Sequence, residues 1–142
     1  MSKTRAQLFA LLFFFLCVSA RASAQDCLSY EPRVERVTGT ILKKTFPGPP
    51  NYESIRGGDR PETFWILHLD RPVCVTGNTD DVNEPEQSVT DLQLVLDEKQ
   101  YAQLRRMPGK KIHVVMSGKL FHAHTAHHRT SVLLSVSSIK RG

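Results

Sequence analysis

The chain has 142 residues, with 19 Lys and Arg against 14 Asp and Glu, which gives a formal net charge of +5 at pH 7. Three of the basic residues, Lys3, Arg5 and Arg21, lie in a predicted signal peptide of 24 residues, and its removal would leave 118 residues, the size of one domain, with a net charge of +2. Such a weak charge excludes an argument for a nucleic-acid partner from composition.

The first 24 residues have the three parts of a secretory signal. Lys3 and Arg5 make the start positive, residues 8–18 are apolar, and residues 22–24 form the small-x-small pattern that signal peptidase accepts. The apolar run is shorter than the roughly 20 residues that span a bilayer, so no membrane anchor is expected. We therefore predict a cleaved signal peptide at 1–24 and a periplasmic or secreted location.

Two cysteines, Cys27 and Cys74, remain in the part of the chain predicted to be exported, whereas Cys17 leaves with the signal peptide. In an oxidising compartment two cysteines most simply form one disulfide, which would tie the new N-terminus to the end of a predicted strand. The alternative is a pair of free, buried thiols.

The first half of the exported part reads as strands and loops. β-Branched residues around one glycine predict a bent strand within 34–46, which a Pro- and Gly-rich loop follows up to Pro61. A second strand is predicted over 63–75, interrupted at Arg71-Pro72, and a polar loop over 76–88 separates it from a third strand at 89–96.

The second half begins with a change of period. Asp97 is a predicted N-cap with Gln100 as its reciprocal partner, and Pro108-Gly109 would end the helix. Alternating strands at 112–117 and 132–137 complete the order. The predicted fold of residues 25–142 is therefore mainly β: a five-stranded OB-fold-like Greek-key barrel with one short helix between strands three and four.

Four of the six histidines fall within seven residues between the last two predicted strands: His122, His124, His127 and His128. Alternation puts His122 and His124 on the core face of the fourth strand. Opposed residues on paired strands share a face, so an odd-length turn would place His128 opposite one of them. The three rings would then converge at the barrel mouth, with His127 in the turn, unless a bulge at Gly118 breaks the parity.

This cluster has two interpretations. In the first, a Zn²⁺ or Cu²⁺ ion is held by three ligands, His122, His124 and His128, because imidazole suits both ions. Alternatively, all four histidines form a hydrogen-bonded turn that contacts a ligand without a metal, since a His-rich tract is only a compositional signal. His68 and His113 are expected to be ordinary strand residues.

Three segments of the chain resemble the bacterial exported family catalogued as domain of unknown function 4431. They are residues 45–55, residues 62–67 and residues 118–128, the last of which contains the specific string Phe-His-Ala-His-Thr-Ala-His-His. The family commonly has Gly where Ala126 stands and a further His where Arg129 stands, so the turn is stiffer here and has one potential ligand fewer. The resemblance implies a small exported protein and carries no activity.

The sequence contains no recognised catalytic motif, so we expect no enzyme. The favoured interpretation is an exported, non-catalytic OB-fold binding module for an unknown small ligand or an exported protein. Its ligand face would comprise predicted strands two and three, the Pro-rich loop and the His hairpin. The alternatives are transition-metal binding through that hairpin, and an inhibitor or immunity-type protein that binds another exported protein. No cofactor other than Zn or Cu is suggested.

Overall fold

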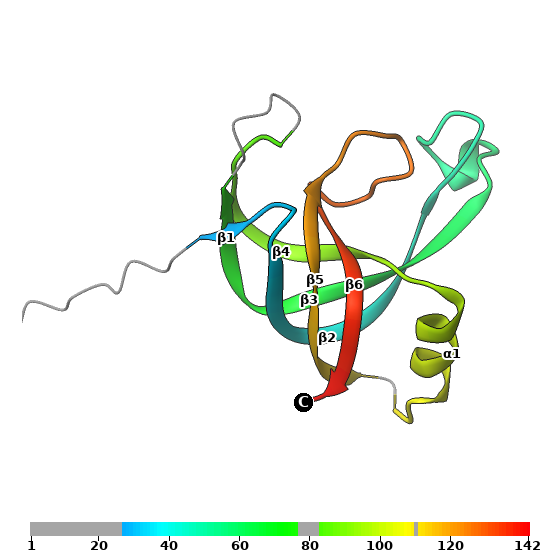
Figure 1. The fold of residues 1–142 in the computed structure, drawn as a ribbon. Helices are drawn as coiled ribbons and strands as arrows, with labels where there is room; N and C mark the ends of the chain where they lie inside the picture. Colours follow the sequence, from blue (N-terminus) through cyan, green and yellow to red (C-terminus); the bar gives the residue numbers. More distant parts are fainter. Residues whose placement is uncertain (1–26, 77–82, 110) are drawn as a thin grey trace, which may run out of the picture.

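The computed structural model describes residues 27–76, 83–109 and 111–142 (Figure 1). The predicted signal peptide at 1–24 lies outside these residues, as does part of the predicted polar loop at 76–88. Within the described ranges, no helix is both long enough and apolar enough to cross a membrane.

The prediction of a mainly β chain is confirmed, with one α-helix. The strands are β1 (Leu28–Ser29), β2 (Val34–Pro47), β3 (Pro61–Thr76), β4 (Glu86–Val95), β5 (Ile112–His122) and β6 (Val132–Arg141), and the helices are the 3-10 turn η1 (Ile55–Gly57) and α1 (Glu98–Arg106). They form one mixed sheet in the order β1-β3-β2-β5-β6-β4, and β3 also pairs with β4, so the pairings return on themselves.

The described sheet has six strands, whereas the sequence predicted five. The additional strand is β1, two residues that pair in parallel with the end of β3 through Leu28 and Val75. A segment of two residues has no alternation of apolar and polar side chains, so no sequence pattern could have predicted it.

The predicted interruption of the second strand at Arg71-Pro72 is wrong, because β3 runs unbroken through it. What changes there is the pairing with β4, whose register shifts between His68 and Val73. Proline cannot donate to a strand ladder, and Pro72 falls in this gap, where the β4 ladder is already irregular.

The core lies inside the curved sheet. β5 alternates without a break, so Ile112, Val114, Met116 and Leu120 are all buried. Helix α1 adds Leu104 to the same cluster. The sheet and α1 therefore enclose one hydrophobic core.

Helix α1 begins and ends as predicted. Asp97 accepts a hydrogen bond from the backbone N–H of Gln100 at 2.8 Å, and the Gln100 side chain accepts one from the N–H of Asp97 at 2.9 Å. This reciprocal pair satisfies two N–H groups that have no partner within the helix. The helix lies at the opposite end of the molecule from the loop between β5 and β6 (Figure 1).

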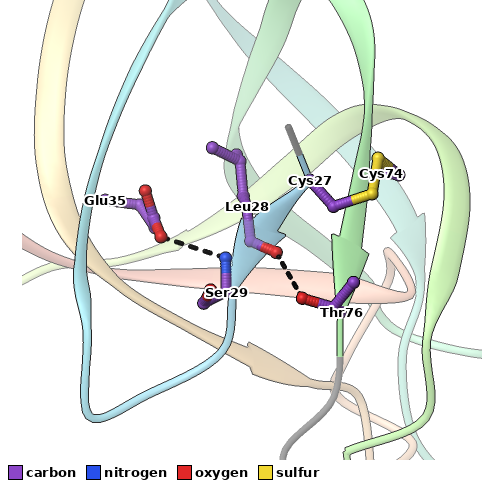
Figure 2. Close-up of a disulfide and its surroundings, with 6 residues drawn as sticks. All are labelled: Cys27, Leu28, Ser29, Glu35, Cys74 and Thr76. Carbon is purple, nitrogen blue, oxygen red and sulfur yellow. Dashed lines mark hydrogen bonds between the residues drawn. A yellow bond between two sulfur atoms is a disulfide. The ribbon is translucent and has the colours of Figure 1, made fainter. Parts of the chain in front are cut away.

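The predicted disulfide is confirmed: Cys27 and Cys74 are bonded, with their Cα atoms 4.7 Å apart. Figure 2 shows how this bond fixes the short strand β1 beside the end of β3. Two further hydrogen bonds hold β1. The Thr76 hydroxyl donates to the carbonyl of Leu28 at 3.3 Å, and the N–H of Ser29 donates to Glu35 Oε1 at 3.0 Å.

Candidate functional site

Two loops lie at the end of the molecule opposite α1 (Figure 1). We call residues 48–60, between β2 and β3, the first loop, and residues 123–131, between β5 and β6, the His loop. The strands that carry the His loop end at a paired position, His122 with Val132. Of the four histidines predicted to form the site, all except His122 therefore belong to the His loop itself.

The predicted pairing of His128 with His122 or His124 is wrong. The strands separate after His122, and the loop closes through hydrogen bonds from the N–H of Ala123 to the carbonyl of Ser131 and from the N–H of His128 to the carbonyl of Thr125. The irregularity at Gly118 that could break the parity does occur, as a register shift between the Ser117 and Gly118 pairs. The alternation of β5 is intact, since every second side-chain position of that strand remains buried on both sides of the shift.

The side chain of His122 contacts Glu86 and Tyr30. Its Nε2 lies 3.0 Å from Glu86 Oε1, and its ring meets the edge of Tyr30 with the ring centroids 6.3 Å apart. Burial, and then the negative charges of Glu86 and Glu84, raise the pKa of Tyr30 to about 12. His122 is thus part of a half-buried polar group beside β4 and the N-terminal segment.

His124 and His128 do come together. Their rings are perpendicular, with centroids 4.7 Å apart, and the N–H of His124 donates to His128 Nδ1 at 3.0 Å. His124 Nδ1 in turn lies 3.1 Å from the carbonyl of His122, to which it can donate. Phe121 packs beside both rings, at 6.3 and 5.9 Å. The pair is therefore fixed by the backbone of the His loop.

The three-histidine metal set is not assembled. Across the described ranges, no three His, Cys, Asp or Glu side chains are placed to hold one metal ion. Of the predicted ligands, His124 and His128 lie together, whereas His122 is bonded to Glu86. A metal site would require His122 to leave Glu86, and Zn or Cu binding stays a prediction.

His127 joins the two loops. Its Nε2 lies 3.3 Å from the hydroxyl of Tyr52, and the two rings meet edge to face at 5.4 Å. Its Nδ1 lies 3.6 Å from Glu62 Oε2. Tyr52 has a φ of +61°, a left-handed conformation that costs a residue other than glycine roughly 1–2 kcal/mol. The first loop therefore holds Tyr52 beside His127 in a strained conformation of the type that clusters at functional sites.

Arg129 makes the second connection between the loops. Its side chain is only 10% exposed, and its guanidinium lies over the rings of Phe46, Tyr52 and Phe64 at 5.7, 5.1 and 5.9 Å. It donates to the carbonyl of Pro47 and lies 3.7 Å from Glu62 Oε2. Arginine stacks on aromatic rings while donating from its edge, so this one side chain fastens the His loop onto the first loop and the adjoining strand ends.

Gln93, a buried residue of β4, anchors the His loop from below. Its Oε1 accepts from the N–H of Arg129 at 2.6 Å, and its Nε2 donates to the carbonyl of His127 at 3.2 Å. Its own N–H donates to the Thr130 hydroxyl at 2.9 Å. These bonds hold the loop in place, because a movement of the loop would leave the buried amide of Gln93 without hydrogen-bond partners, which is unfavourable.

Asp59 orders the first loop. Its carboxylate accepts hydrogen bonds from the N–H groups of Ser54, Asn51 and Glu53, each at 2.8 Å. The bonds from Ser54 and Asn51 are the main reason why the pKa of Asp59 lies below its usual range, although partial desolvation opposes them. The carboxylate thus stabilises the turn that carries Tyr52.

Sequence analysis found the histidines but not the side chains that position them. These side chains are distant in the sequence. Tyr52 and Glu62 lie 31 or more residues before Gln93, and Arg129 follows 36 residues after it, so no local motif links them. One signal was available: residues 45–55, 62–67 and 118–128 were grouped by family resemblance, and the structure brings these three segments into contact.

Residues 91–140 match the family model described as Domain of unknown function (DUF4431). The match confirms the family suggested by the sequence and runs from β4 through α1, β5 and the His loop into β6. Neither a curated protein nor a solved structure matches the chain. The matched residues therefore include every histidine of the His loop together with Gln93 and Arg129.

The pKa of His128 gives a first testable prediction. Burial, and then the charges of His124 and His127, lower this pKa from its ordinary value of 6.5. The unfolded chain then binds a proton more readily than the folded one. The contribution of His128 to the free energy of unfolding is therefore fully present above about pH 6.5 and is lost as the pH falls through the lowered native pKa. In an NMR titration of the imidazole protons, His128 is expected to titrate below 6.5.

The variant His124→Ala should raise the pKa of His128, because it removes the larger of the two unfavourable charges. His113→Ala is the matched control, since His113 lies on β5 and pairs with Asp70, away from the loop. A value for His128 at or above 6.5 in the unaltered protein would contradict the packing of the two rings.

Proposed function

We propose that this chain is an exported, non-catalytic OB-fold module that binds a polar, uncharged ligand through the first loop and the His loop. Support for the fold comes from the pairing order of the five long strands. β2 pairs with β3, β3 with β4, β4 in parallel with β6, and β6 with β5, which returns to β2. With α1 between β4 and β5, this is the connectivity expected of an OB-fold barrel. The Cys27–Cys74 disulfide supports an oxidising compartment.

The observation that carries the proposal is the joining of the two loops. In OB-folds, the loops between strands one and two and between strands four and five flank the ligand face. Their counterparts here are the first loop and the His loop, which Tyr52, His127 and Arg129 connect into one surface. Beneath it, Glu62 Oε2 and Arg129 Nε are buried and, among the described residues, have no hydrogen-bond partner. At the surface itself, the largely exposed imidazole of His127 beside the Tyr52 hydroxyl favours a polar ligand over an apolar one.

Charge favours an uncharged ligand over an oligonucleotide. The first loop carries Glu53 and Asp59 against Arg56 and Arg60, so its formal charges cancel. Binding to a phosphate backbone depends on a surplus of Lys and Arg along the groove. Rings of Tyr and His beside hydroxyl, imidazole and amide groups suit a neutral oligosaccharide, which presents hydroxyl groups and apolar ring faces.

The test is a microarray of neutral and anionic glycans, probed with tag-free protein purified after export. We expect binding to neutral glycans, and we expect Tyr52→Ala and His127→Ala each to reduce it at least about tenfold, the loss of roughly 1.4 kcal/mol. Both side chains lie at the junction of the loops, and His127 is largely exposed, with 59% of its side chain accessible.

The matched control is His113→Ala, the same replacement on the part of β5 distant from the His loop. It should leave glycan binding unchanged. Binding confined to anionic glycans, or equal loss in the His113 variant, would contradict the proposal. Failure on every glycan, together with saturable binding of another exported protein that Tyr52→Ala abolishes, would replace it with the inhibitor or immunity-type interpretation.

A further inference from the structure

A second candidate site lies at the other end of the molecule. A cleft of about 630 Å³ opens between α1 and the β2–β3 hairpin, on the side where the helix covers the sheet. Small-molecule sites in proteins typically enclose about 300–1,000 Å³. None of the residues that connect the first loop to the His loop lines this cleft, so it is independent of the function proposed above.

The cleft has an apolar floor. Ile41, Leu104 and Ile112 are buried members of the core and line its base, while Trp65 and Met107 are partly buried and pack against the same core. These side chains come from β2, β3, α1 and β5 and from the residue that ends the helix. An apolar body placed on this floor would be stabilised by the apolar surface that it removes from water.

The rim is positively charged. The lining of the cleft includes Lys43, Lys44, Arg105 and Lys111, and none of the described residues that line it is acidic. Lys44 is already neutralised by Asp91, with Nζ 2.6 Å from Oδ2. Lys43 holds its ammonium 4.4 Å from the centre of the Trp65 ring, and Arg105 and Lys111 are both exposed. Three cations thus border an apolar pocket, and no lining residue within the described ranges carries a counter-charge.

We infer that this cleft binds a small amphipathic anion, with an apolar acyl or aryl body against Trp65 and Met107, the partly buried side chains of the floor, and a carboxylate at the rim. An apolar ligand without charge would leave the three cations without a partner, and an anion without an apolar body would leave the floor in water. Only a molecule with both parts matches the two surfaces. The Lys43 ammonium is held at the rim by the indole face, so the carboxylate meets a positioned charge.

The test uses the single tryptophan of the chain as its reporter, because Trp65 lines the cleft. The protein is titrated with sodium octanoate below its micellar concentration and, separately, with 1-octanol, which has the same apolar body without the charge. We expect a saturable change in Trp65 emission with octanoate, and at least a tenfold weaker response to octanol. Binding should also weaken at high salt, because the rim is exposed to solvent.

The variant Arg105→Gln with Lys111→Gln should weaken octanoate binding at least tenfold and leave the melting temperature unchanged, since both side chains are exposed. Arg105→Gln alone should also weaken binding, and Arg106→Gln is its matched control: it removes one positive charge from the same helix, but Arg106 does not line the cleft. Equal affinity for octanoate and octanol, equal loss in the control, or no saturable response to octanoate would each overturn the inference. Glycan binding at the loops is measured separately, so the two proposals can fail independently.

Discussion

Replacing Gly118 by alanine is expected to lower the free energy of unfolding by at least about 3 kcal/mol, because the methyl group has no space. A Cβ atom at this position would lie 2.2 Å from the carbonyl oxygen of Ser135 and 2.9 Å from Leu134 Cδ1. The first of these atoms is backbone of the paired strand β6, so it cannot move aside as the end of a flexible side chain would. Urea unfolding followed by far-ultraviolet circular dichroism measures the change.

The control is Gly57→Ala in the exposed turn η1, where the added Cβ would meet only Ser54, at 3.3 Å from its Cβ. That variant should lie within about 1 kcal/mol of the unaltered protein. Gly39→Ala on β2 should behave like Gly118→Ala, since its Cβ would lie 2.2 Å from the carbonyl oxygen of His68. If all three variants were equally stable, the close approach of the strands at these two glycines would be wrong.

The parts of the fold that depend on neighbouring residues could be predicted from the sequence. Alternation identified the core residues of β5, and the capping pair Asp97 and Gln100 placed the start of α1, because both depend on neighbours in the chain. The short strand β1 and the unbroken course of β3 depend instead on pairing across the sheet. Local patterns do not contain that information.

The candidate site divides in the same way. Composition and spacing were enough to select the His loop, and the cysteine count was enough to predict the disulfide. The orientation of each ring was not predictable, because Glu86, Tyr52 and Gln93 decide it from other strands and loops. The prediction put three rings on one face because it assumed that strand alternation continues past His122. The strands separate there, and hydrogen bonds to the backbone of His122 and His124 orient the rings of His124 and His128.

Loss of the Cys27–Cys74 disulfide is expected to have the second large effect, a decrease of up to about 4 kcal/mol in the free energy of unfolding. The two cysteines are 47 residues apart, and closing a loop of that length removes this much chain entropy from the unfolded state at 25 °C. The bond also holds β1, whose ladder with β3 has only two residue pairs. Urea unfolding of Cys27→Ser with Cys74→Ser, compared with the unaltered protein, measures the decrease.

The reductant supplies the control. Dithiothreitol should lower the stability of the unaltered protein toward that of the double serine variant, and it should leave the variant itself unchanged. Hydrogen exchange should locate the remaining effect at β1 and at the buried Tyr30 that follows it, since β1 is then held by its hydrogen bonds with Thr76 and Glu35, its short ladder and the packing of Leu28 (Figure 2). Two freely labelled thiols in the folded, untreated protein would contradict the bond, and with it the argument that this chain works in an oxidising compartment.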